Sequence, residues 1–151
     1  MKILIPVGDV VSKQLITQAL HILSAFKNPL IVLFHVIEVP SRTATLEPEP
    51  YRTEIKKAEQ KLTNLSQWLT DQGLKARVKV VVARNVAEGI IDETETEGYL
   101  ITFLMKRKIA KGWRRLLIRS VSERVVRSAN CLVMTAPLEQ LSPRIANLSK
   151  H

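Results

Sequence analysis

The sequence predicts an α/β protein with a single open sheet of five parallel strands and helices on both faces. Short apolar runs alternate along the chain with segments whose apolar residues recur at helical spacing, in the order β-α-β-α-β-α-β-α-β. The run at residues 30–39 is apolar except at His35 and Glu38, which is typical of a strand buried on both faces of a parallel sheet. The length of 151 residues suits one domain with a sizeable core.

The first expected unit is a strand followed by a helix. Residues 2–7 form a short apolar run that ends in a turn. Asp9 or Ser12 can cap the helix that follows, and Asn28 and Pro29 end it. Apolar residues at helical spacing between these ends indicate one face that packs on the sheet.

The second unit joins the buried strand at residues 30–39 to the most regular helix in the chain. Three prolines and little apolar surface mark residues 40–50 as the loop between them. The apolar residues of the helix step by three or four positions, and Gly73 ends it. These apolar residues are Ile55, Ala58, Leu62, Leu65 and Leu69.

The third unit consists of a strand at residues 78–82, a short helix at residues 86–98 and a fourth strand at residues 99–105. Four acids gather on the helix, and we interpret them as a solvated face. They are Asp92, Glu93, Glu95 and Glu97.

The last unit begins at Ser120, which fits a capping box together with Glu123. Residues 131–135 are expected to form the fifth strand. The predicted domain therefore spans residues 1–137, and a mostly polar tail occupies residues 138–151.

The net charge of +9 is concentrated in one basic stretch. From Lys106 to Arg127 the chain carries nine Lys or Arg residues and one acid, Glu123, so this stretch supplies +8 of the total. An anionic partner is therefore considered: a nucleic acid, acidic lipid headgroups or an acidic protein. Trp113 in this stretch could stack on a nucleobase or pack on the protein itself. Zinc spacing, an RRM signature and a basic heptad are absent from the sequence, so only an electrostatic mode of nucleic-acid binding is considered.

The sequence contains no pattern that indicates catalysis or metal binding. His21, His35, His151 and Cys131 are scattered and lack the spacing of metal ligands. We interpret His35 as a core or sheet-edge residue and Cys131 as buried and inert. The Gly-x-Ser-x-Gly, Walker and Gly-x-Gly-x-x-Gly motifs are all absent from the sequence. We therefore expect neither an enzyme nor a metal site.

Cysteine usage and hydropathy indicate the compartment. Cys131 is the single cysteine, so an intrachain disulfide is impossible, which agrees with a reducing environment. The chain has no apolar run of membrane-spanning length, and its first residues lack the core and cleavage site of a signal peptide. We therefore expect a cytoplasmic protein.

Residues 116–133 read LLIRSVSERVVRSANCLV. They resemble the C-terminal block of the universal stress protein family, in which leucines precede Gly-Ser-Val-Ser-Glu-Arg-Val, a short apolar helix and Cys-Pro-Val. Residues 3–7, 34–36 and 86–90 resemble the family's first strand, second strand and third helix. The resemblance covers residues 1 to about 137 and implies a Rossmann-like fold, similar to that of the adenine nucleotide alpha hydrolases. It also implies a homodimer formed through the last strand, Cys131 to Thr135.

ATP-binding members of that family carry G-x2-G-x9-G-[ST] after the fourth strand. Glycines let backbone N–H groups approach phosphate oxygens closely, and the following helix N-terminus favours negative charge. Aligned on Ser120, the three glycine positions fall on Lys106, Ile109 and Arg119. Only Gly112 matches a glycine that is common in the loop.

The turn after the first strand also departs from the family pattern. ATP binders place an aspartate directly after this strand, where the chain has Gly8, and Asp9 follows one residue later. Our first hypothesis is therefore a non-catalytic regulatory module of the stress response. It would be dimeric, would not bind ATP in the usual way, and would act on an unknown protein partner or sense a small anion.

The alternative hypothesis keeps ATP, AMP or another phosphate-bearing anion as a ligand. Lys106, Arg119 and the helix N-terminus at Ser120 would then replace the glycine loop. The competing interpretation of Ser120 is helix capping alone. For Lys106 and Arg119 the competing interpretation is that they occlude a lost site or belong to a solvated surface. A last alternative is an electrostatic nucleic-acid binder. The altered nucleotide site would contain Pro6, Val7, Gly8, Asp9, Val36, Met105, Lys106, Gly112, Arg119, Ser120 and Val121.

Overall fold

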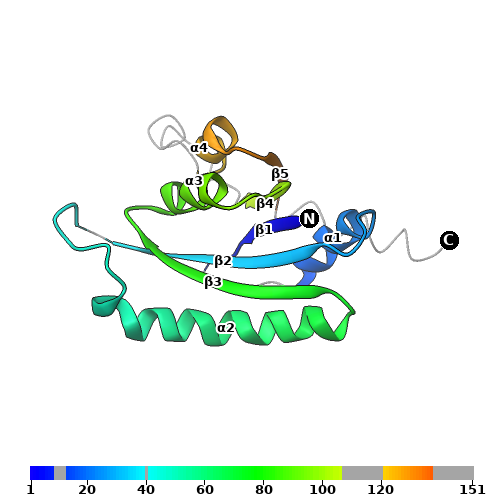
Figure 1. The fold of residues 1–151 in the computed structure, drawn as a ribbon, viewed down its shortest axis with the longest axis horizontal. Coiled ribbons are helices and arrows are strands. Elements are labelled where there is room, and N and C mark those ends of the chain that lie inside the picture. The colour runs from blue at the N-terminus through cyan, green and yellow to red at the C-terminus, as the bar shows by residue number, and fades with distance from the viewer. Residues whose placement is uncertain (9–12, 40, 107–120, 138–151) are drawn as a thin grey trace.

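A computed structural model of the chain describes residues 1–8, 13–39, 41–106 and 121–137, in which the elements follow the predicted order (Figure 1). The strands of this part are β1 (Lys2–Pro6), β2 (Leu30–Glu38), β3 (Lys75–Ala83), β4 (Ile101–Lys106) and β5 (Leu132–Pro137). The helices are α1 (Lys13–Leu23), α2 (Arg52–Asp71), α3 (Val86–Thr96) and α4 (Val121–Ser128), with a short 3₁₀ turn η1 (Glu49–Tyr51) before α2.

The five strands form one sheet in the order β3-β2-β1-β4-β5, and every neighbouring pair is parallel. This confirms the predicted fold class. The chain leaves β1 toward β2 and β3, then returns to the other side of β1 to form β4 and β5. The strand order therefore reverses between β1 and β4, whose carboxyl ends lie side by side.

Alternation of side chains along the strands separates two cores, one on each face of the sheet. On β1, Ile3 and Ile5 join the core beneath α1 and α2, whereas Leu4 joins the core beneath α3 and α4. Figure 1 shows α2 on one side of the sheet, with α3 and α4 on the other. The prediction of helices on both faces is thus confirmed.

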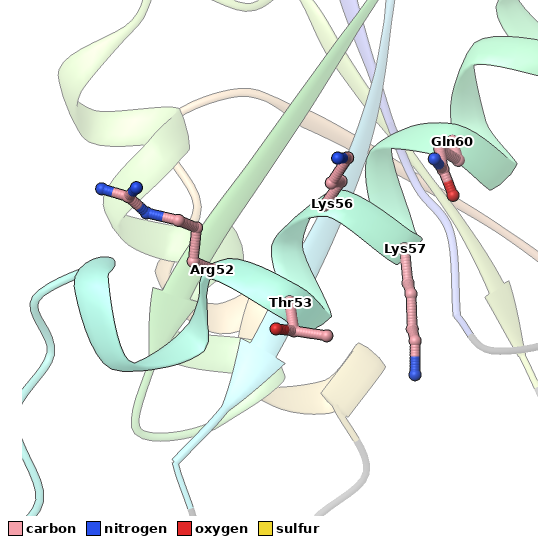
Figure 2. A pocket seen from close by; sticks show the side chains of 5 residues that line it. All are labelled: Arg52, Thr53, Lys56, Lys57 and Gln60. Atoms are coloured by element: carbon pink, nitrogen blue, oxygen red, sulfur yellow. The ribbon is translucent and has the colours of Figure 1, made fainter.

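Helix α2 is amphipathic, as its residue spacing predicts. Its buried residues are Ala58, Leu62, Leu65 and Leu69. Gly73 has a φ of +82°, a left-handed conformation that suits glycine and ends the helix. Polar side chains on the opposite face of the first half surround a shallow hollow of about 320 Å³ (Figure 2). They are Arg52, Thr53, Lys56, Lys57 and Gln60.

The predicted end of the first helix was wrong by about one turn. Helix α1 ends at Leu23, and the chain continues through three-residue turns, in which the N–H of Phe26 donates to the carbonyl of Leu23 at 3.0 Å. Asn28 then takes a φ of +47°, a left-handed conformation that asparagine tolerates. Local turn bonds therefore replace the last helical turn before β2.

Helix α3 lies unusually close to the sheet at Gly89. A Cβ atom at this position would lie 2.7 Å from Cγ2 of Val36 and 3.2 Å from Cβ of Ala83. Val36 belongs to β2 and Ala83 to β3, and both are buried. Only glycine therefore permits this distance between α3 and the two strands.

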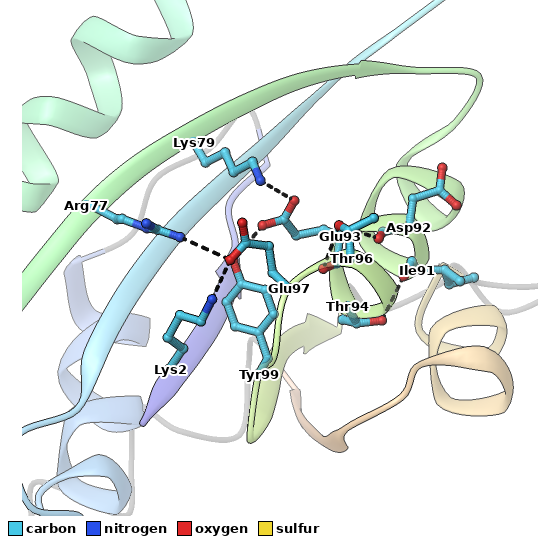
Figure 3. Close-up of polar contacts among 10 residues, drawn as sticks. All are labelled: Lys2, Arg77, Lys79, Ile91, Asp92, Glu93, Thr94, Thr96, Glu97 and Tyr99. Atoms are coloured by element: carbon cyan, nitrogen blue, oxygen red, sulfur yellow. Dashed lines mark hydrogen bonds and ion pairs between the residues drawn. The ribbon is translucent and has the colours of Figure 1, made fainter.

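The acids of α3 do not form one solvated face, so that interpretation was wrong. Asp92 and Glu95 are exposed, but the side chain of Glu93 is 4% exposed. One carboxylate oxygen of Glu93 accepts a hydrogen bond of 2.6 Å from the Tyr99 hydroxyl, and the other lies 2.7 Å from Nζ of Lys79 (Figure 3). Both oxygens of this buried carboxylate are thus compensated.

Glu97 continues this polar network to the start of the sheet. Its Oε2 accepts a hydrogen bond from Nζ of Lys2 and lies 3.8 Å from Nη2 of Arg77 (Figure 3). Lys2 holds the pKa of Glu97 below its ordinary value of 4.5, with smaller contributions from Lys79 and Arg77. Burial raises the pKa of Tyr99 well above its ordinary value, and the neighbouring Glu93 carboxylate raises it further. The network joins the end of α3 to β1 and β3.

Replacing Gly89 by alanine is expected to lower the free energy of unfolding by about 1 kcal/mol, because overpacking against a stiff valine outweighs the gain in helix propensity. Urea denaturation followed by circular dichroism measures the change. Gly98→Ala is the matched control, since a Cβ there would meet no atom within 4 Å. If both variants are as stable as the wild type, the close approach of α3 is contradicted.

Glu97→Gln is expected to be less stable than the wild type at about pH 7, and this difference should shrink as the pH falls to about 3. The pKa of Glu97 is lower in the folded than in the unfolded protein, so its charge stabilises the fold above the unfolded-state pKa. That contribution is lost as the pH falls through the folded-state pKa. Denaturant titrations at the two pH values measure the free energy of unfolding of the variant and the wild type. Glu95→Gln is the control, because Glu95 is an exposed acid of α3. A pH-independent difference would rule out this role of the Glu97 charge.

Candidate functional site

The strand order reverses between β1 and β4, and ligands of open parallel sheets commonly bind at the carboxyl ends of the strands beside such a point. Leu4 of β1 is in register with Thr102 of β4, so both strands run side by side toward this edge. Pro6 ends β1 and is followed by Val7 and Gly8, and Met105 and Lys106 end the neighbouring parallel strand β4. These five positions come from the predicted nucleotide site.

A histidine holds the end of β1 against β2. The N–H of Val7 donates to the carbonyl of Phe34 at 2.7 Å, and Nδ1 of His35 lies 2.7 Å from the carbonyl oxygen of Val7. Because a carbonyl can only accept, Nδ1 of His35 carries the proton. The half-buried imidazole thus fixes the turn that presents exposed Gly8 at the edge of the sheet.

Val36 also lies near this edge, but its side chain is directed into the core. It is 7% exposed and packs against α3 at Gly89. Val121, another predicted site residue, is the first residue of α4 and is 40% exposed. The remaining predicted site residues lie outside the described part of the chain. They are Asp9, Gly112, Arg119 and Ser120.

Two arginines at the end of the basic stretch are engaged in contacts within the protein. Nη1 of Arg124 donates to Oδ1 of Asn85 at 2.8 Å, and Nη2 lies 3.8 Å from Glu88. Arg127 forms an ion pair of 3.1 Å with Glu123, one turn earlier on α4. The Asn85 oxygen also caps α3 by accepting from the N–H of Glu88 at 3.0 Å. Arg124 therefore joins α4 to the start of α3, a contact that the charge pattern alone did not predict.

A second hollow, of about 240 Å³, opens between the carboxyl end of the sheet and α2. Alternation along β2 places His35 and Ile37 on the face that α2 covers. Sequence reasoning missed the contribution of α2, although a lysine beside each of the buried positions 58 and 62 was a usable signal. The lining residues are Gly8, His35, Ile37, Glu54, Lys57, Ala58, Lys61 and Leu62.

Strand β5 lies at one edge of the sheet. It begins at Leu132, which is 64% exposed, one residue later than predicted. Cys131, expected to be buried, is half-buried, and its Sγ lies 3.1 Å from the hydroxyl of Thr102. Val126 of α4 is also exposed. This edge thus presents apolar side chains to solvent.

The described residues contain no group of three or more His, Cys, Asp or Glu side chains that could hold a metal ion. Among the helices of the same part of the chain, none combines the length and apolar character needed to cross a membrane.

Comparisons with solved structures agree with this fold. The hypothetical protein MJ0577 is 24% identical, with a TM-score of 0.69 over 92% of this chain and 96% of that one. Universal stress protein UspA from Lactobacillus plantarum is 17% identical, with a TM-score of 0.63 over 89% and 95% of the two chains. A universal stress protein family protein from Arabidopsis thaliana, solved with AMP bound, is 17% identical, with a TM-score of 0.60 over 92% of each chain.

The sequence itself carries the family relationship. No curated protein matches the chain. The profile of the universal stress protein family, in contrast, matches residues 1–137, which include all the described strands and helices. The chain therefore belongs to the universal stress protein family.

Proposed function

We propose that this universal stress protein is a non-catalytic regulatory module of the cytoplasm that does not hold ATP through a glycine loop. The observation that carries the proposal is the presence of Lys106, Ile109 and Arg119 at the three glycine positions of ATP-binding members. Side chains at such positions keep backbone N–H groups away from phosphate oxygens. The buried side chain of Val36 also supports the proposal, since a side chain in the core is not available to line a pocket for an adenine base.

A second candidate function keeps an adenine nucleotide at the carboxyl ends of β1 and β4. Two observations favour it: the strand order reverses between these strands, and the similar Arabidopsis protein was solved with AMP bound. In this case Arg119 would supply by charge what the glycine loop supplies by backbone N–H groups.

We also propose a homodimer formed through β5. This strand is at the edge of the sheet, and Leu132 and Val126 leave apolar surface exposed beside it. An edge strand with exposed apolar side chains favours pairing with another chain. A second copy is the occupant that the family relationship favours.

Protein freed of bound nucleotide by denaturation and refolding should show no micromolar binding when titrated calorimetrically with ATP or AMP. The physical reason is the loss of the glycine backbone at residues 106, 109 and 119. Arg119→Ala and the loop control Arg42→Ala should behave like the wild type. Micromolar binding that is lost in Arg119→Ala, but kept in Arg42→Ala, would instead establish the second candidate function.

Sedimentation analysis at micromolar concentration should show a dimer for the wild type and a monomer for Leu132→Lys. A buried lysine at the centre of an apolar contact carries a large desolvation cost. Leu46→Lys is the matched control, because Leu46 is 44% exposed and lies in the segment before α2, far from β5 in the chain. A wild-type monomer, or a Leu132→Lys dimer, would refute association through this strand.

A further inference from the structure

The hollow between the sheet and α2, here called the α2 hollow, has a rigid frame. Ala58 and Leu62 of α2 are buried, and Leu62 belongs to the core beneath this helix. The ring of His35 is held from the opposite side by its bond to the Val7 carbonyl. The α2 hollow therefore has walls that are already ordered without a ligand.

Its charged groups form an unusual combination. Lys57 and Lys61 lie one helical turn apart, a spacing at which like charges destabilise a helix. Neither lysine has an ion-pair partner among the described residues, although both line the same concave surface. An anion bound between the two ammonium groups would remove this repulsion and gain charge-assisted hydrogen bonds.

The other lining groups restrict the ligand. Since Nδ1 of His35 bonds to the chain, Nε2 is the ring nitrogen that can face a ligand. Glu54 adds one carboxylate, which accepts hydrogen bonds and repels a second anionic group. Ile37, Ala58 and Leu62 supply apolar surface. The volume of about 240 Å³ is small for a ligand pocket.

We propose that the α2 hollow binds the phosphoryl group of a small phosphate compound. Lys57 and Lys61 hold the phosphoryl oxygens, His35 contacts the ligand through Nε2, and Glu54 accepts a hydrogen bond from a ligand hydroxyl. The inference goes beyond the proposed function, because it places an anion on the α2 face and uses none of the residues at the altered glycine positions.

Calorimetric titration with glycerol phosphate and with inorganic phosphate tests the site. For Lys57→Gln and Lys61→Gln the Kd for glycerol phosphate should rise about tenfold each, the loss expected for one charge-assisted hydrogen bond. Lys56→Gln is the matched control: Lys56 neighbours Lys57 in the chain, yet it lines only the outer hollow, and Figure 2 shows the two side chains pointing in different directions. The Kd of the Lys56→Gln variant for glycerol phosphate should equal that of the wild type.

Titrating the Glu54→Gln variant with glycerol phosphate and with inorganic phosphate shows whether the bound phosphoryl group belongs to a phosphate ester or to free phosphate. Weaker binding of glycerol phosphate, with binding of inorganic phosphate that is unchanged or tighter because a negative charge is removed, supports a hydroxylated phosphate ester that bonds to Glu54. Equal affinity for both ligands, with the same lysine dependence, supports the phosphoryl site and assigns free phosphate to it.

Three results would overturn the inference. The first is absence of binding to the wild type at millimolar ligand, and the second is an equal effect of the Lys56, Lys57 and Lys61 variants, which marks general surface charge. The third is binding that depends on Arg119 and not on Lys57, which places the anion at the altered glycine positions. Binding of ATP or AMP that is lost in Arg119→Ala and kept in Lys57→Gln contradicts the proposed function alone, so failures of the two are distinguishable.

Discussion

Strand β1 lies at the centre of the sheet, and the side chains of Ile3, Leu4 and Ile5 are fully shielded from water. Parallel strands of this kind require cover on both faces, because their apolar side chains alternate between them. Burial of each such side chain contributes roughly 1.5–3 kcal/mol. The need to cover both faces of β1 explains why α1 and α2 pack on one side, why α3 and α4 pack on the other, and why the chain crosses over between strands.

Two devices attach α3 to the sheet. Near its beginning, Gly89 removes the side chain that would hold the helix away from β2 and β3. Toward its end, Glu93 forms an ion pair with Lys79. Just after the helix, Glu97 forms ion pairs with Lys2 and Arg77. A buried carboxylate is tolerated only when its oxygens are paired, and Tyr99 completes the pairing of Glu93. This network includes Lys2 at the start of β1 and Tyr99 just before β4, so it lies toward the amino ends of these strands.

The carboxyl ends combine a rigid turn with two differently charged surroundings. His35 fixes the turn after β1, and Gly8 in this turn lines the α2 hollow. In the proposed function Lys106, Ile109 and Arg119 stand at the positions of the family's glycine cradle, whereas α2 contributes lysines without ion-pair partners among the described residues. Exchanges of surface side chains alone would suffice for such a change, because the backbone frame is set by the core.

The order of strands and helices, the buried stripe of α2 and the family could be predicted from the sequence, because periodicity, turn residues and the block at residues 116–133 are local signals. The position of Val7 and Gly8 at a strand end was predicted in the same way. The burial of Glu93, the bond between His35 and Val7 and the α2 hollow could not be predicted. Each of these three features depends on residues from separate elements that meet in space. A pattern along the sequence does not show which strand neighbours which helix.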